Sequence, residues 1–195
     1  MRLATLVVMT AMGGSGWADE TSAAHLRNVT VCVNAGYELQ TASAAKKLAA
    51  KMFAGIGVGI EWRTYSVCSP ADAIRVDFSN HTPASEHPHA LAYACPFGTT
   101  IVVYQDRLER LSKAIRPEQL LSWVLVHEIS HILQSVDRHS ATGIMKAHWT
   151  SGDYFDLQSK GPGFTAEEVD LIHTGLANRA LRVAGTDLQL VVAVR

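Results

Sequence analysis

The sequence predicts an α+β fold: a twisted, mostly parallel sheet with a backing helix and one buried helix, then a small C-terminal part with a further helix. Residues 28–34 and 57–63 alternate apolar and polar side chains, as strands do, and a segment with helical spacing separates them. This order implies a parallel pair with a right-handed crossover. Residues 117–136 are apolar around nearly the whole circumference of a helix, which is typical of a buried helix.

Residues 1–18 are typical of a secretory signal peptide. Arg2 gives a positive start, residues 3–12 are apolar but too short to span a bilayer, and small residues precede a cleavage site after Ala18. We therefore expect residues 19–195 to be exported, either secreted or periplasmic. No later segment is long and apolar enough for a membrane anchor.

The length and charge of the chain indicate one domain without a nucleic-acid partner. A chain of 195 residues fits a single domain with its own core after processing. The net charge is −1, and no basic patch stands out in the sequence. We expect an N-terminal subdomain at about 28–136 and a C-terminal subdomain at about 137–195.

The remaining elements follow in order. Residues 41–54 have apolar side chains at helical spacing, and residues 73–79 alternate as a third strand. Residues 98–107 form the most apolar strand, which we expect at the sheet edge beside the cleft, where a substrate chain can add to it. The loop 80–90 contains three histidines, which we expect to be solvated because no ligand spacing is recognisable. A short apolar tail at 187–195 is expected to form a strand or a packing arm.

The mature chain has three cysteines, so one intramolecular disulfide at most can form in an oxidising compartment. Cys68 and Cys95 both lie beside prolines in loop-like sequence, and we expect them to pair. Cys32 lies in an apolar strand and is expected to be a buried, free thiol.

His127-Glu128-Ile129-Ser130-His131 forms an HExxH motif in the predicted buried helix. Residues four apart share one helix face, so the two histidines can bind one metal ion while Glu128 reaches a water on that ion. Burying these side chains in an apolar helix costs on the order of several kcal/mol unless they are paired or ligated. The motif therefore favours one Zn2+ ion over a core helix with satisfied histidines.

A catalytic zinc site needs a third protein ligand and one open position. His139 lies eight residues after His131, and Asp137 lies six residues after it. Residues 165–180 have the apolar spacing of an amphipathic helix, and Glu167 or Glu168 on that helix would give a gluzincin-type site. Glu168 is already explained by a capping box at the start of that helix.

The segment from His127 to Met145 resembles the metzincin clan of zinc metallopeptidases. In this segment HExxH is followed by His139-Ser140 and then by Gly143-Ile144-Met145. The resemblance implies that the zinc helix ends in a turn, that a third ligand follows, and that Met145 lies in a tight turn beneath the metal. The order of strands and helices before the motif is also similar.

The sequence departs from the clan pattern in two places. Gln134 stands where the clan has the glycine of the turn, and Asp137 stands at the usual ligand position. Either Asp137 binds, or the helix runs longer and His139 binds; we favour His139 because imidazole is the commoner zinc ligand. Several members carry a tyrosine shortly after the methionine, whereas this chain offers His148 and Tyr154 near the expected cleft.

The resemblance implies a zinc-dependent endopeptidase that acts on a peptide or protein substrate. A zinc-bound water would attack the peptide carbonyl, with Glu128 as the general base. The alternative is a non-catalytic, zinc-binding, peptidase-like module. Glu128 argues against this alternative, since a purely structural site has no use for that residue.

Overall fold

The computed structural model describes residues 27–34, 36–68, 72–95, 97–161 and 163–193. The predicted signal peptide lies outside the described residues. The elements in chain order are β1 (Arg27–Val33), α1 (Leu39–Ala54), β2 (Val58–Thr64), a 3-10 turn (Tyr65–Val67), β3 (Ile74–Ser79), β4 (Ala92–Ala94), β5 (Thr100–Tyr104), α2 (Gln105–Leu111), α3 (Pro117–Gln134), α4 (Ser151–Lys160) and α5 (Ala166–Ala193).

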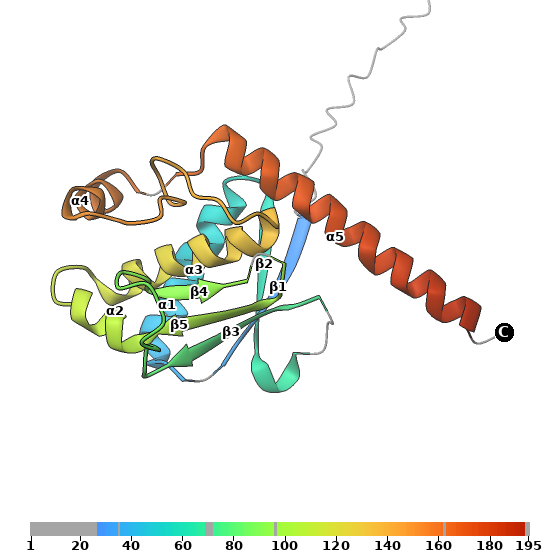
Figure 1. Ribbon diagram of the computed structural model, residues 1–195, viewed down its shortest axis with the longest axis horizontal. Helices are drawn as coiled ribbons and strands as arrows, with labels where there is room; N and C mark the ends of the chain where they lie inside the picture. Colours follow the sequence, from blue (N-terminus) through green and yellow to red (C-terminus); the bar gives the residue numbers. More distant parts are fainter. Residues whose placement is uncertain (1–26, 35, 69–71, 96, 162, 194–195) are drawn as a thin grey trace, which may run out of the picture.

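The sheet has five strands in the order β2-β1-β3-β5-β4 (Figure 1). The first four run parallel and β4 runs antiparallel, so the predicted mostly parallel sheet is confirmed. β5 lies between β3 and β4, so the prediction that it forms the sheet edge is wrong. The edge is β4, whose three residues, Ala-Tyr-Ala, are too few to show an alternating pattern.

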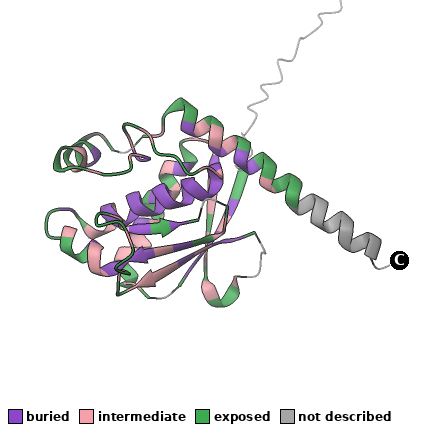
Figure 2. Cartoon of the chain, in the orientation of Figure 1, coloured by how far each residue is buried: buried purple, intermediate pink, exposed green. Residues whose placement is uncertain are grey.

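Helix α3 is buried along most of its length, as predicted. It begins at Pro117, whose missing N–H is harmless in the first turn, and every residue from Leu120 to Gln134 is buried (Figure 2). It packs against α1, β4 and α5. The side chains of the HExxH motif therefore stand on the most enclosed element of the fold.

The C-terminal part is more helical than predicted. Helix α4 was not expected, and α5 includes residues 187–193, where we expected a strand or packing arm (Figure 1). Ile172 is fully buried and Leu176 nearly so where α5 packs on α3. The approach is close, since a Cβ added to Gly175 would lie 1.7 Å from the carbonyl oxygen of Leu133.

The disulfide joins Cys32 to Cys68, with 5.9 Å between the Cα atoms, so the predicted pair of Cys68 and Cys95 is wrong. Cys68 follows β2 and Cys95 follows β4, and these strands form opposite edges of the sheet. β1 and β2 are neighbours, with Cys32 opposite Arg63, which brings Cys32 close to the chain that leaves β2. Cys95 is an exposed free thiol. Flanking prolines indicated loops correctly but gave no information on distance.

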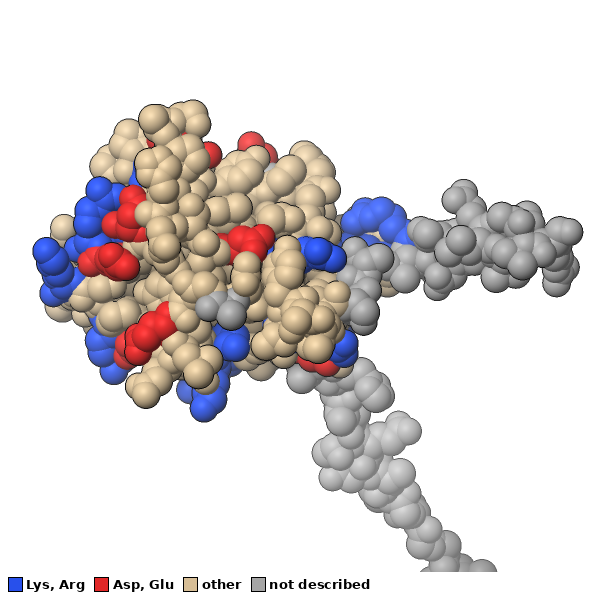
Figure 3. Space-filling model, turned by 90° about the horizontal axis from the view of Figure 1, so that it is seen from below, with Lys and Arg blue, Asp and Glu red and all other residues tan. Residues whose placement is uncertain are grey.

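The charged side chains are mixed on the face shown in Figure 3, where Lys and Arg lie among Asp and Glu. That face therefore carries no extended patch of one sign. The absence of a nucleic-acid partner stays a prediction. Within the described part of the chain, no helix combines the length and apolar character needed to cross a membrane.

Candidate metal centre

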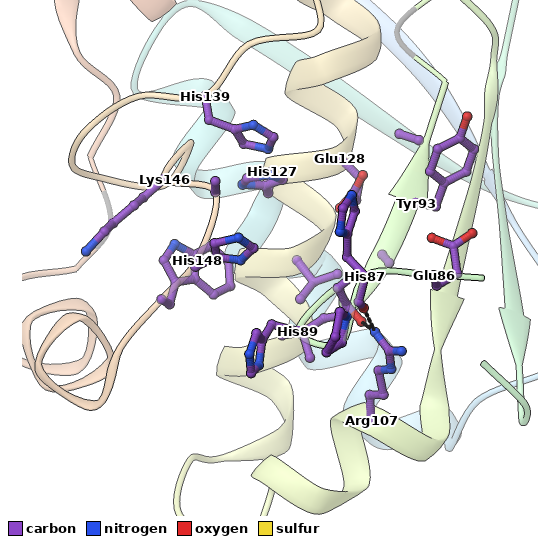
Figure 4. A pocket seen from close by; sticks show the side chains of 18 of the residues that line it. Glu86, His87, His89, Tyr93, Arg107, His127, Glu128, His139, Lys146 and His148 are labelled. Atoms are coloured by element: carbon purple, nitrogen blue, oxygen red, sulfur yellow. Dashed lines mark hydrogen bonds between the residues drawn. The ribbon is translucent and has the colours of Figure 1, made fainter. Parts of the chain in front are cut away.

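Three histidines converge at one side of α3. His127 and His131 stand one helical turn apart on α3, and His139 comes from the loop that follows (Figure 4). The Nε2 atom of His131 lies 3.1 Å from that of His127 and 3.2 Å from that of His139. One nitrogen of each ring lies within 4.8 Å of the others, which is a spacing that one metal ion can bridge.

The helix ends earlier than our preference for His139 assumed. α3 stops at Gln134, and Ser135 takes the left-handed conformation with φ 53°. The turn therefore falls just after the position of the clan glycine, although a non-glycine residue in this conformation costs roughly 1–2 kcal/mol. In the part of the chain that the structure describes, the metal-competent group contains His139 and not Asp137. Asp137 lines the adjacent cavity.

The backbone of a tight turn at residues 143–146 forms hydrogen bonds with His127 and with Ser140, the neighbour of His139. His127 Nδ1 donates a hydrogen bond of 2.7 Å to the Ile144 carbonyl, so its Nε2 carries a free lone pair. The Ser140 amide, next to His139, donates a bond of 2.8 Å to the Met145 carbonyl. Gly143 has φ 77°, which suits a glycine in a tight turn. Met145, in the same turn, is buried.

Desolvation, strongest at the two buried rings of His127 and His131, lowers the pKa of all three imidazoles. Desolvation, with a smaller effect of the neighbouring His131, lowers the pKa of His127 to about 3. Desolvation and His139 lower the pKa of His131 to about 4, and desolvation also lowers the pKa of His139. Near neutral pH the three rings therefore present unprotonated nitrogens to one another. A single proton on the Nε2 atom of His131 can form a good hydrogen bond with His127 or with His139, but not with both. A metal cation can instead bind the nitrogen lone pairs of all three rings, so the donor set fits Zn2+.

Glu128 is buried beside this cluster. Its exposed fraction is 8%, and desolvation raises the pKa of its carboxyl to about 8. The side chain lines the same pocket as Tyr93 of β4 (Figure 4). A carboxyl whose protonation changes near neutral pH is suited to accepting and returning a proton.

A cavity of about 1020 Å³ runs past the histidines. It is lined by loop 86–91 and β4 on one side, by α3 along its floor, and by residues 146–150 with Tyr154 on the other. Trp149 stands edge-on to the ring of His127, with 5.7 Å between the ring centroids. The expectation that His148 and Tyr154 lie near the cleft is confirmed, because both line this cavity.

The three histidines of loop 80–90 are exposed, as predicted, and two of them also line the cavity. His87 and His89 line the cavity, and the ring of His89 meets that of His148 edge-on, with 5.9 Å between centroids. The side chain of Arg107 holds the loop in place by donating hydrogen bonds to the carbonyls of His87 and Ala90. No pattern in the sequence indicates this placement, because it depends on contacts between the loop and Arg107 of α2.

The two glutamates of the gluzincin-type alternative have other partners. Glu167 forms an ion pair with Arg138. Glu168 accepts bonds from Ser140 and from the Thr165 amide, which confirms the predicted capping box. Neither carboxylate belongs to the histidine group found among the described residues.

Comparison with known proteins supports the fold. No protein-family model and no curated protein match the sequence. The structure is similar to the crystal structure of archaemetzincin from Methanopyrus kandleri, with a TM-score of 0.53 and 14% sequence identity. The match covers 77% of this chain and 97% of that chain. At this identity the similarity concerns the fold alone.

Proposed function

We propose that the protein is a zinc-dependent peptidase whose metal is held by His127, His131 and His139. The observation that carries the proposal is the convergence of three neutral imidazoles and a buried glutamate on the wall of one large open cavity. The fold similarity to a protein named archaemetzincin agrees with the metzincin resemblance of the motif.

Zinc at this site would polarise a substrate carbonyl and make a water molecule more acidic. Glu128 accepts a proton from that water as the oxygen attacks the carbonyl carbon. It then passes the proton to the leaving nitrogen, and the C–N bond breaks. In the metal-free site the pKa of Glu128 is about 8, and a cation held by the three histidines would lower it, so that the carboxylate could act as a base.

The substrate is a peptide or protein chain that lies along β4. This strand is the edge of the sheet and borders the cavity. An edge strand presents unpaired backbone groups to which an extended chain can add. The side chain of Tyr93 is 51% exposed there and offers an aromatic surface to the substrate.

The test is Glu128→Gln in the mature, zinc-loaded protein. We expect the variant to keep zinc, measured by metal analysis, and to lose roughly 10²- to 10⁴-fold in the rate of cleavage of a fluorogenic peptide library. Glu118→Gln is the matched control, because Glu118 lies in the first turn of the same helix and pairs with Arg116. Cleavage by Glu128→Gln at the wild-type rate would contradict the assignment of the base.

The rival reading, a non-catalytic zinc-binding module, predicts a different result. Such a module would bind one zinc ion per chain but cleave no member of the library. His131→Ala should abolish zinc binding whether or not the protein is an enzyme. Metal analysis therefore tests the ligands, and the cleavage assay separately tests the activity.

A further inference from the structure

The loop that carries His139 is held on both sides by the first turn of α5. On one side, the guanidinium of Arg138 donates two hydrogen bonds to Glu167, at 2.5 and 2.9 Å. On the other side, the hydroxyl of Ser140 donates to one oxygen of Glu168. The second oxygen of Glu168 accepts a bond of 2.7 Å from the Thr165 amide. Two consecutive glutamates therefore hold the two neighbours of His139.

The two contacts stabilise the loop to different extents. The Arg138 and Glu167 side chains are 45% and 63% exposed, and ion pairs this open contribute little in water. Glu168 is only 3% exposed and both of its oxygens have protein partners. Removing a buried acceptor leaves its donors unsatisfied, so the Glu168 contact is the one expected to matter.

His139 depends on such contacts more than the other two histidines. His127 and His131 are fixed by the buried helix α3, whereas His139 lies in a loop and is itself exposed. The Ser140 amide ties this loop to the Met145 carbonyl, and its hydroxyl ties it to Glu168. A ligand held in place before the metal arrives loses less conformational freedom on binding.

Helix α5 is in turn anchored to the end of α3. Gly175 lies seven residues after Glu168 and meets the backbone of Leu133 at a distance that admits no side chain. The path from the zinc helix through α5 and Ser140 to His139 is therefore a continuous series of close contacts.

We propose that Glu168 is a positioning residue that holds His139 in place for the metal. The proposal rests on the proposed zinc site and concerns the ordering of its third ligand. Glu168 touches neither metal nor substrate, and it acts through the hydroxyl of Ser140. Its loss is expected to weaken zinc binding because His139 is then less often in position to bind the metal.

The experiment measures zinc affinity by competition with a chromophoric chelator in the full mature protein. We expect Glu168→Ala to weaken zinc binding about 10-fold, at the low end of the effect of groups that support metal ligands. Ser140→Ala should reproduce this loss, and Glu167→Ala should weaken binding less than about 3-fold. Thr165→Ala is the matched control, because it removes the other half of the capping box and leaves the Ser140 contact intact.

A double variant separates positioning from general stability. In a His139→Ala background, Glu168→Ala should cause no further loss of affinity, because the ligand it positions is gone. Cobalt(II) in Glu168→Ala should give a visible spectrum shifted towards that of His139→Ala. Equal losses in Thr165→Ala and Glu168→Ala, or an undiminished loss in the His139→Ala background, would overturn the proposal. Wild-type affinity in His139→Ala would instead refute the ligand set itself.

Discussion

Gly175→Ala tests the close crossing of α5 and α3. In an ordinary helix this change stabilises by about 1 kcal/mol, because alanine favours the helix more than glycine does. Here the new Cβ would lie 1.7 Å from the Leu133 carbonyl oxygen and 2.9 Å from its carbonyl carbon. These are backbone atoms of a buried helix, so no side chain can turn aside to make room.

The steric cost should exceed the gain in helix propensity. Ordinary contact begins near 3.4 Å, so the helices must separate by roughly 1.7 Å at this point, and the packing of Ile172 and Leu176 on α3 loosens. Overpacking of this kind costs about 1–3 kcal/mol and more where backbone atoms collide. Taking about 3 kcal/mol for the collision and subtracting about 1 kcal/mol of propensity leaves a net loss of about 2 kcal/mol.

Thermal unfolding followed by circular dichroism measures this loss. For a chain of this size, about 2 kcal/mol lowers the Tm by roughly 4–8 °C. Gly152→Ala in α4 is the control, because a Cβ there meets only the Thr150 hydroxyl oxygen at 3.8 Å. A Gly175→Ala variant as stable as the wild type would show that the two helices do not meet as closely as the structure has them.

Two further predictions concern stability. The bond between Cys32 and Cys68 closes a loop with a sequence separation of 36, so Cys68→Ala should lower the free energy of unfolding by about 4 kcal/mol, and a reducing agent should destabilise the wild type but not the variant in urea unfolding. In the metal-free protein, the pKa values of His127 and His131 are lowered to about 3 and 4, so below about pH 6.5 the unfolded chain binds more protons than the folded chain, and stability falls as the pH falls. The pKa of Glu128 is raised to about 8, so between about pH 4.5 and 8 the folded chain holds a proton that the unfolded chain has lost, and this contribution to stability falls as the pH rises. Below about pH 6.5 the two histidines outweigh the one glutamate, and above it only the glutamate acts. Urea midpoints across pH 4–9 should therefore peak near pH 6.5, and an unchanging midpoint would contradict the burial of these groups.

The sequence was sufficient to predict the parts of the site that depend on helix geometry. His127 and His131 come together because a spacing of four residues places them on one face of a helix, whatever surrounds it. The apolar character of residues 120–136 also indicated correctly that this helix is buried. The parallel sheet followed from the strand, helix, strand order for a similar reason, since the handedness of the crossover is a local property.

The parts that failed depend on contacts between segments distant in the sequence. Which cysteines pair depends on which strands are neighbours in the sheet, and the sequence around a loop cysteine does not indicate this. Strand β4 is too short to show a pattern, and its place at the edge is decided by pairing with β5. The sequence also made no prediction that His87 and His89 border the cavity, a placement that depends on hydrogen bonds from Arg107 on another element to their loop. Each error therefore came from tertiary pairing and not from local propensity.

His139 lies between these two cases. Its residue type predicted a ligand, yet the longer helix that we invoked for it is absent, because the chain turns at Ser135. What brings His139 to the site is a set of tertiary bonds from Ser140 to the Met145 carbonyl and to Glu168. Of the three proposed ligands, His127 and His131 are thus held by the buried helix α3, and His139 by hydrogen bonds of the loop that follows it. Conformational differences between the metal-free and zinc-loaded protein should consequently concentrate in residues 135–146, and hydrogen exchange there should slow most when zinc binds.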